Sequence, residues 1–391
     1  MLKISKSAYR AHSSFIRTPL SKRQNVFLQV NNDIVREFWI LIERYSEIED
    51  AGKDFIRSKG VRHKTKINIM FKSFQALVRQ AKSFYLSAQQ MQTRSASLLY
   101  YYSFLNLVKA GIILNKPDLV NKKLGHGLYY TVQKHRKFNN ETLGVTYKDN
   151  SVFPIFYNDY FNKVLDTKYF NINSLLGYCT DIGYQYLQAG YGYGRILPSF
   201  HTMLFQNDNK SYWSLIGIND FKDLLKYKKS LKIFSENFDQ VEVSDLKLFK
   251  YNIREIFNID AKTASAFTFF QSKNVFPVPA NNIVPDVEFR KKNLESLKNI
   301  MQSYYFGRQY DFSIALPYSL TKEEPLDETA AIYLIMYYLS CLVRYKPYYL
   351  EELLNRQEAW LIDSFIQSCP STFLKGIISW IVDIDYVLTL R

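Results

Sequence analysis

The chain has 391 residues, of which 47% are hydrophobic and 16% aromatic, and it contains only 14 glycines and 11 prolines. This composition excludes a disordered chain and favours long helices over a loop-rich β fold, so we expect a mainly α protein with a large helical body. The formal net charge is +15, and residues 1–150 carry all of the excess, with 26 Lys and Arg against 10 Asp and Glu, which indicates an anionic partner.

The cysteines and the apolar segments indicate the cellular compartment of the protein. Cys179, Cys341 and Cys369 are widely spaced, which excludes a disulfide framework and a cysteine-based zinc site and is typical of a reducing cytoplasm. The most apolar run, residues 330–343, is shorter than the roughly 20 residues that span a bilayer. We therefore expect a cytoplasmic protein that needs no membrane, no metal and no cofactor.

Residues 1–130 are expected to form a basic helical N-terminal region, because apolar residues recur there at helical spacing. The stretch 51–66 is basic and carries two glycines, and it is expected to be a loop. The expected helices are 31–49, 67–90 and 94–114.

Residues 131–320 are expected to form a mixed α/β middle region with a helix at 219–236. Alternating pieces such as SAFTFFQS predict a minor β element within residues 240–320. Residues 321–391 are expected to form a C-terminal helical region that packs on the N-terminal helices. Its expected helices are 328–345, 349–368 and 371–390.

The expected helix at 94–114 is mostly apolar but carries a polar stripe. At 100° per residue, five residues fall within about a third of the helix circumference: Arg94, Ser95, Tyr102, Asn106 and Lys109. A buried cation needs a partner, since leaving it unpaired costs several kcal/mol. Either the stripe pairs with neighbouring polar groups, or it lines a pocket that binds an anion.

The sequence RYKP ends the expected helix at 328–345. Pro347 disfavours helical backbone at the residue before it, and Arg344 then lies at the helix C-terminus, where a cation is stabilised. That placement accounts for Arg344 structurally. A functional alternative is that Arg344 and Tyr345 meet the Arg94 stripe around a shared anion.

The histidines give candidates for acid–base chemistry. His126 lies between two glycines in LGHGL, where backbone freedom brings a side chain near a ligand, although a histidine that only closes a turn fits as well. Arg57 with His63, and Arg195 with His201, have the Arg–His spacing of HEPN-type ribonucleases. Such pairs are also expected by chance, and neither lies at the start of an expected helix as that motif requires.

Two stretches together resemble the YaaC-like family of bacterial proteins. The first is RSASLLYYYSFLNLVKAGIIL with the following GHG, within residues 94–127. The second is YLIMYYLSCLVRYKPYYLEELL, residues 333–354. The resemblance implies a cytoplasmic, largely helical bacterial protein.

Three hypotheses of function remain open at this point. The first is binding of an anionic partner, either RNA, DNA or a nucleotide, through the basic N-terminal region, as a component of a bacterial defence or stress system. The second is a HEPN-like ribonuclease with His126 or His63 as the acid–base group and Arg94 on the phosphate. The third is a scaffold without chemistry that binds a protein partner. For the first, the predicted anion-binding residues are Arg94, Ser95, Asn106, Lys109, Arg344 and Tyr345.

Overall fold

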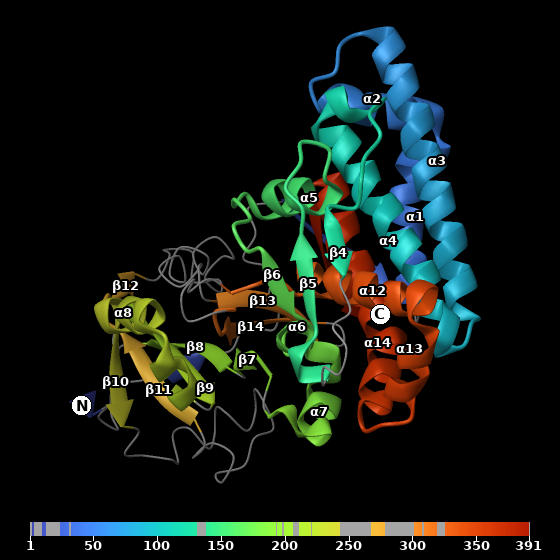
Figure 1. The fold of residues 1–391 in the computed structure, drawn as a ribbon. Coiled ribbons are helices and arrows are strands. Elements are labelled where there is room, and N and C mark those ends of the chain that lie inside the picture. Colours follow the sequence, from blue (N-terminus) through green and yellow to red (C-terminus); the bar gives the residue numbers. More distant parts are fainter. Residues whose placement is uncertain are drawn as a thin grey trace. The chain divides into compact units, whose positions relative to one another are not determined.

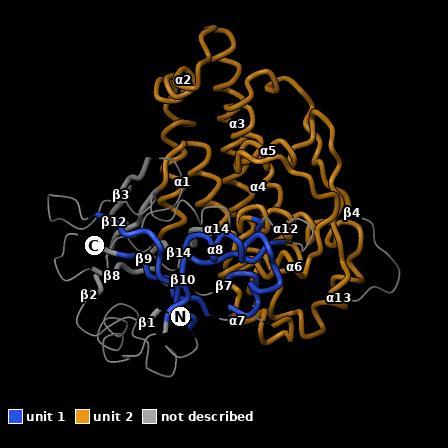
Figure 2. The backbone as a smooth tube through the Cα atoms, turned by 90° about the vertical axis from the view of Figure 1, so that its left-hand side faces the viewer, with its two compact units in different colours: residues 1–22, 195–326 blue, residues 23–194, 327–391 orange. Residues whose placement is uncertain are grey.

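The fold was analysed in a computed structural model of the chain. The structure describes residues 2–3, 10–12, 24–30, 33–130, 138–192, 194–197, 199–205, 211–219, 221–242, 267–277, 301–306, 309–318 and 325–390. The chain divides into two compact units (Figure 2). Unit 1 comprises residues 1–22 and 195–326, and unit 2 comprises residues 23–194 and 327–391.

Unit 2 is built mainly of helices (Figure 1). Together with the small sheets described below, they make the protein mainly α with minor β, as the composition predicts. The longer helices are α1 (Ile34–Glu47), α2 (Glu49–Ser58), α3 (Lys64–Gln89), α4 (Thr93–Asn115), α5 (Val152–Phe161), α12 (Glu328–Tyr345), α13 (Pro347–Leu354) and α14 (Glu358–Val382).

Helix α4 lies at the centre of this unit and packs against α3, α5, α12 and α14. The Phe104 ring on α4 stacks on Phe373 of α14 with the centroids 3.9 Å apart. Gly111 permits close approach to α14, because a Cβ there would lie 1.9 Å from the Trp380 ring. The helix is long and apolar enough to cross a membrane by length and composition, and 78% of its most apolar window is buried within the protein.

The ends of α12 follow from its sequence. The Asp327 side chain accepts a hydrogen bond from the Thr329 backbone N–H and caps the first turn. Pro347 begins α13, so the chain turns at Lys346. These two signals place α12 at the expected residues 328–345.

Two small sheets complete unit 2. The strands β4 (Leu128–Tyr130), β5 (Thr142–Val145) and β6 (Tyr169–Asn171) form an antiparallel sheet in that order. The strand β15 (Ile384–Leu390) pairs in parallel with β3 (Gln24–Val30), with Ile384 opposite Gln24. Short helical pieces follow β6 along the chain, among them α6 (Ile172–Leu176), η3 (Thr180–Ile182) and α7 (Gly183–Tyr186).

Unit 1 contains the larger sheet, in the order β1-β10-β11-β9-β8-β2, with β12 also paired to β9. A second sheet has the order β13-β14-β7. The strands are β1 (Leu2–Lys3), β2 (Arg10–His12), β7 (Ile196–Leu197), β8 (Ser199–Phe205), β9 (Ser211–Asn219), β10 (Phe238–Glu242), β11 (Phe267–Ser272), β12 (Phe276–Pro277), β13 (Met301–Phe306) and β14 (Gln309–Ala315).

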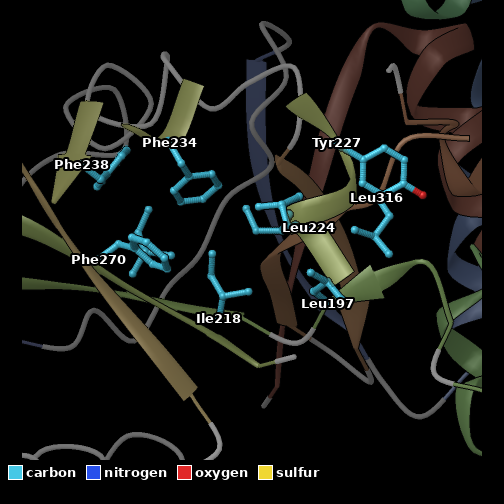
Figure 3. Packing of buried hydrophobic residues seen from close by; sticks show 10 residues of the cluster. Leu197, Ile218, Leu224, Tyr227, Phe234, Phe238, Phe270 and Leu316 are labelled. Carbon is cyan, nitrogen blue, oxygen red and sulfur yellow. The ribbon is translucent and has the colours of Figure 1, made fainter. Parts of the chain in front are cut away.

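A compact aromatic and aliphatic core holds unit 1 together (Figure 3). The helix α8 (Lys228–Asn237) contributes Phe234, whose ring centroid lies 5.2 Å from that of Phe270 on β11. Ile218 on β9 is fully buried in the same cluster. This packing explains why the alternating apolar residues of 240–320 form strands, as at β11 and β14.

Three local predictions were wrong. The helix expected at 349–368 is divided between α13 and α14, and α14 continues through Pro370, where a break was expected. Most of the expected loop at 51–66 is helical, because α2 packs on α1 and α3, with Gly52 against the Phe71 ring. The expected helix at 371–390 ends at Val382, and β15 follows, because its backbone pairs with β3 from the start of the chain. The expected division at residues 130 and 320 stays a prediction.

Candidate functional site

Three cationic side chains from separate segments of unit 2 gather in one place. Lys109 lies on α4, His126 lies in the segment between α4 and β4, and Arg344 lies in the last turn of α12. Each is half-buried. We call these three residues the cationic cluster.

The backbone around His126 is fixed by hydrogen bonds to the start of α5. The Phe153 N–H donates to the His126 carbonyl at 3.1 Å, and the Val152 N–H donates to the Gly125 carbonyl at 2.8 Å. Gly127 has a φ of +74°, a conformation that favours glycine. The GHG sequence therefore gives His126 a defined position and not a mobile one.

Two buried tyrosines orient the His126 ring. The Tyr101 hydroxyl on α4 lies 2.5 Å from His126 Nδ1. The Tyr337 hydroxyl on α12 donates to the Leu128 carbonyl at 2.8 Å, and its ring lies beside both Tyr101 and His126. Burial raises the pKa of Tyr101 well above its usual range, so its hydroxyl keeps the proton. The hydroxyl can accept from Nδ1 or donate to it, and it donates in the neutral tautomer whose Nδ1 has no hydrogen. In that tautomer Nε2 carries the ring hydrogen.

Arg344 is held by its own helix and by aromatic rings. Its Nε donates to the Ser340 carbonyl at 3.2 Å, and one terminal nitrogen, Nη2, contacts Ser340 Oγ at 3.3 Å. The guanidinium carbon lies 6.0 Å from the Tyr102 ring centroid and 4.9 Å from that of Tyr345. These contacts use one side of the guanidinium and leave Nη1 without a hydrogen bond to any described residue.

The charges of Arg344 and Lys109 act on His126. Burial, and then the positive charges of Arg344 and Lys109, lower the pKa of His126 below its usual 6.5. Burial also lowers the pKa of Lys109. Both shifts mean that positive charge is disfavoured at this place until an anion enters it.

No carboxylate within the described part of the chain forms an ion pair with the cationic cluster. Other cations of the same unit do have such partners: Arg79 binds Glu47, and Lys66 binds Asp118. Half-buried cations are normally paired; Lys163 of the same unit is half-buried and without an ion pair too, so the cluster differs in bringing three basic groups together without an acid of the described chain.

The structure places the predicted anion-binding residues in two groups. Lys109 and Arg344 belong to the cluster, and Tyr345 flanks it. Arg94, in contrast, forms a two-pronged ion pair with Glu351 of α13, with Nε and Oε1 2.6 Å apart. The Asn106 amide donates to Gln80 Oε1 at 2.9 Å, and Ser95 is exposed.

The other histidine candidates lie elsewhere. His63 is exposed and directly precedes α3, without a capping hydrogen bond from its side chain. Arg195 Nη1 donates to the Pro317 carbonyl at 2.9 Å in unit 1, and the side chain of His201 lies outside the described residues. Only His126 of the two acid–base candidates joins other cationic groups.

Sequence reasoning missed Tyr101 and Tyr337 as the residues that orient His126. A signal was present for Tyr101, which precedes the stripe residue Tyr102 in the YYY run of α4. Nothing local pointed to Tyr337, because its contact with His126 joins segments more than 200 residues apart.

The chemistry that this arrangement allows is anion recognition. Lys109 and Arg344 supply positive charge, and His126 supplies an Nε2–H donor or, once protonated, a third charge. Among the described residues, no three His, Cys, Asp or Glu side chains gather as they would to hold a metal ion.

Comparison with known proteins gives one match. The model of the YaaC-like protein family matches residues 49–381, which include α2 to α5, α12 and α13, and nearly all of α14. No curated protein and no solved structure matches the chain.

Proposed function

The chain belongs to the YaaC-like protein family, and we propose that it binds the phosphate of an anionic partner, RNA, DNA or a nucleotide, at the cationic cluster. One observation carries this proposal. Three half-buried basic side chains from three segments, two of them cations and one a histidine, come together without an acid of the described chain to neutralise them.

The charge distribution of the sequence supports the same proposal. Lys109 and His126 lie in the first 150 residues, which hold the whole basic excess. A positive field of this kind concentrates polyanions near the surface and speeds their association. The cluster adds what a solvated surface lacks, namely fixed donors in a partly dry environment, where charge-assisted hydrogen bonds are strong.

The proposal is tested by equilibrium titration of the full chain with inorganic phosphate, a ribonucleotide, and single-stranded RNA and DNA, at about 50 and about 200 mM salt. We expect saturable binding that weakens as the salt rises, because ion exchange at phosphates drives it. Arg344→Ala should weaken binding at least tenfold, since a hydrogen bond to a charged group is lost.

Arg94→Ala is the matched control. It removes an arginine of α4, the helix that carries Lys109, but one that already binds Glu351. Equal binding by wild type and Arg344→Ala would refute the proposal, as would a loss of binding in Arg94→Ala alone.

A HEPN-like ribonuclease is the second candidate, favoured by the position of His126 beside two cations. Its Nε2 would serve as the acid–base group, and Arg344 rather than Arg94 would contact the phosphate. RNA cleavage that is lost in a folded His126→Ala variant would support this function. Cleavage retained in that variant, or no cleavage by wild type, would leave binding as the function.

A further inference from the structure

An exposed aromatic side chain borders the cationic cluster. Tyr345, at the end of α12, is 64% exposed although its ring contacts the Arg344 guanidinium. Tyr348, in the first turn of α13, is 92% exposed. Tyrosine rings with this much exposed apolar surface beside fixed cations are typical of sites that stack nucleic-acid bases.

We propose that the ligand is a nucleotide with a terminal phosphomonoester, whose phosphate binds the cationic cluster and whose base stacks on Tyr345. This inference rests on the proposed function and names the ligand class of the same site. The phosphomonoester is shared by free nucleotides and by the 5′-phosphate end of a nucleic acid.

The charge of the site favours a monoester over a diester. A phosphomonoester carries between −1.5 and −2 charges near neutral pH, as phosphorylated side chains do, whereas each internal phosphodiester carries one. Lys109 and Arg344 together offer two positive charges, and His126 adds a hydrogen-bond donor. The charge of a dianion therefore matches that of the two half-buried cations, whereas a diester matches only one of them.

Arg344 adjoins both the place proposed for the phosphate and the place proposed for the base. Its guanidinium contacts the Tyr345 ring on one side, and its unused Nη1 offers donors to a phosphate oxygen. A nucleotide has a complementary arrangement, because a sugar joins its anionic phosphate to its aromatic base. We therefore expect phosphate and base to contact adjacent residues, Arg344 and Tyr345.

The test compares ligands that differ in one part. The full chain is titrated with AMP, ribose 5-phosphate, adenosine, and a dinucleoside phosphodiester without a terminal phosphate. AMP should bind about ten times tighter than ribose 5-phosphate, within the range that one stacked base contributes. Adenosine and the phosphodiester should bind more weakly than AMP.

Tyr345→Ala should remove the advantage of AMP and leave ribose 5-phosphate unchanged, while Tyr345→Phe should keep it. Tyr184→Ala is the matched control, because Tyr184 is equally exposed, at 64%, but lies on α7. The affinities of oligoribonucleotides with a 5′-phosphate and with a 5′-hydroxyl are then compared. Tighter binding of the 5′-phosphate form than of AMP indicates a nucleic-acid end as the source of the phosphomonoester, and weaker binding indicates a free nucleotide.

The outcomes separate this inference from the proposed function. If AMP and ribose 5-phosphate bind equally, or if the phosphodiester binds as tightly as AMP, the inference is wrong although a phosphate site exists. An equal loss of both ligands in Tyr345→Ala also overturns it, because the ring would then only position Arg344. If none of the phosphates binds, the proposed function itself fails.

Discussion

The cationic cluster and a group of buried acids lie in the same helical unit and are built in opposite ways. Glu328, the first residue of α12, accepts hydrogen bonds from the Thr180 N–H at 2.6 Å and from the Thr180 hydroxyl at 2.8 Å. Asp181 accepts from the Thr372 hydroxyl on α14 at 2.6 Å. We call Glu328 and Asp181 the carboxyl pair.

The carboxyl pair and the cationic cluster differ in whether the chain itself supplies partners for their polar groups. The carboxyl pair has donors from its own chain, and burial together with the charge of Asp181 raises the pKa of Glu328 to about 8, so Glu328 is protonated at neutral pH. Through its hydrogen bonds to Thr180, Glu328 joins the segment around η3 to α12. The cationic cluster has no acid of the described chain, and it stays accessible. Polar groups that satisfy one another indicate architecture, whereas groups left unneutralised at a surface indicate a ligand.

The largest effect should come from removing two members of the cluster. The double variant Lys109→Ala, Arg344→Ala is expected to lose about a hundredfold or more in nucleotide affinity, since two charge-assisted hydrogen bonds disappear. Its thermal stability should fall only slightly, because neither cation pairs with an acid of the described chain and Arg344 loses only its contacts with Ser340 and with two aromatic rings. Binding is measured by calorimetric titration and stability by thermal melting.

A double variant that melts well below wild type would break the comparison, because the cluster would then serve the fold. Glu328→Ala is the matched variant from the other group and should leave nucleotide affinity unchanged.

Glu328→Ala should instead lower the free energy of unfolding by about 1–3 kcal/mol. The substitution leaves the part-buried Thr180 N–H without its acceptor. Urea denaturation followed by circular dichroism measures this loss. Stability equal to wild type would show that the Thr180 contacts contribute little and that the carboxyl pair has another purpose.

The pH dependence of the free energy of unfolding should also distinguish the carboxyl pair from the cationic cluster. The pKa of Glu328 is about 8 in the folded protein and near 4.5 in the unfolded chain, so between these values the folded state binds the extra proton. The free energy of unfolding therefore falls as the pH rises from about 5 to about 8, by at most about 1.4 kcal/mol per unit from this group.

Glu328→Gln isolates that contribution, because the amide oxygen still accepts from Thr180 but cannot ionise. The nearby Lys375, whose pKa burial lowers well below its usual range, adds a slope of opposite sign that both proteins share. The free energies of unfolding of the two proteins should be similar near pH 5 and should diverge as the pH rises toward 8, where Glu328→Gln becomes the more stable protein. Parallel curves would mean that Glu328 is ionised in the folded protein at neutral pH.

The smallest effect concerns His126 and the pH dependence of anion binding. Sulfate is a suitable probe because it stays a dianion across the range. It should offset the charges of Lys109 and Arg344 that lower the His126 pKa, so binding takes up a proton and affinity rises about fivefold from pH 7.5 to 5.5. Tyr101 accommodates both states, since its hydroxyl can donate to Nδ1 or accept from it.

His126→Gln should bind sulfate with little dependence on pH, because the amide does not titrate. Calorimetry in two buffers of different ionisation enthalpy counts the proton directly. A proton uptake that persists in His126→Gln would assign the effect to Lys109, whose pKa burial lowers.

The helices could be predicted from the sequence where local signals define their ends. Asp327 and Pro347 mark α12, and the apolar run of α4 extends only one residue beyond the expected range at each end. The strand β15 could not be predicted, because its apolar residues suit a helix equally well and only pairing with the distant β3 decides between the two.

The candidate site could be predicted in part. Lys109, His126 and Arg344 were each singled out by a local anomaly: a cation in an apolar helix, a histidine between glycines, and an arginine before a proline. Which of them meet was beyond local reasoning. Arg94 lies on the same stripe as Lys109 but binds Glu351, a partner 257 residues away that no spacing along α4 reveals.

The most direct test of the account is a crystal structure of the full chain grown with tungstate, a phosphate analogue that is located by its anomalous scattering. We predict an anomalous peak within hydrogen-bonding distance of Lys109 Nζ, His126 Nε2 and Arg344 Nη1. Electron density that instead places a carboxylate of the chain against these three groups, with no tungstate bound there, would contradict the account, because the cluster would then be satisfied internally like the carboxyl pair.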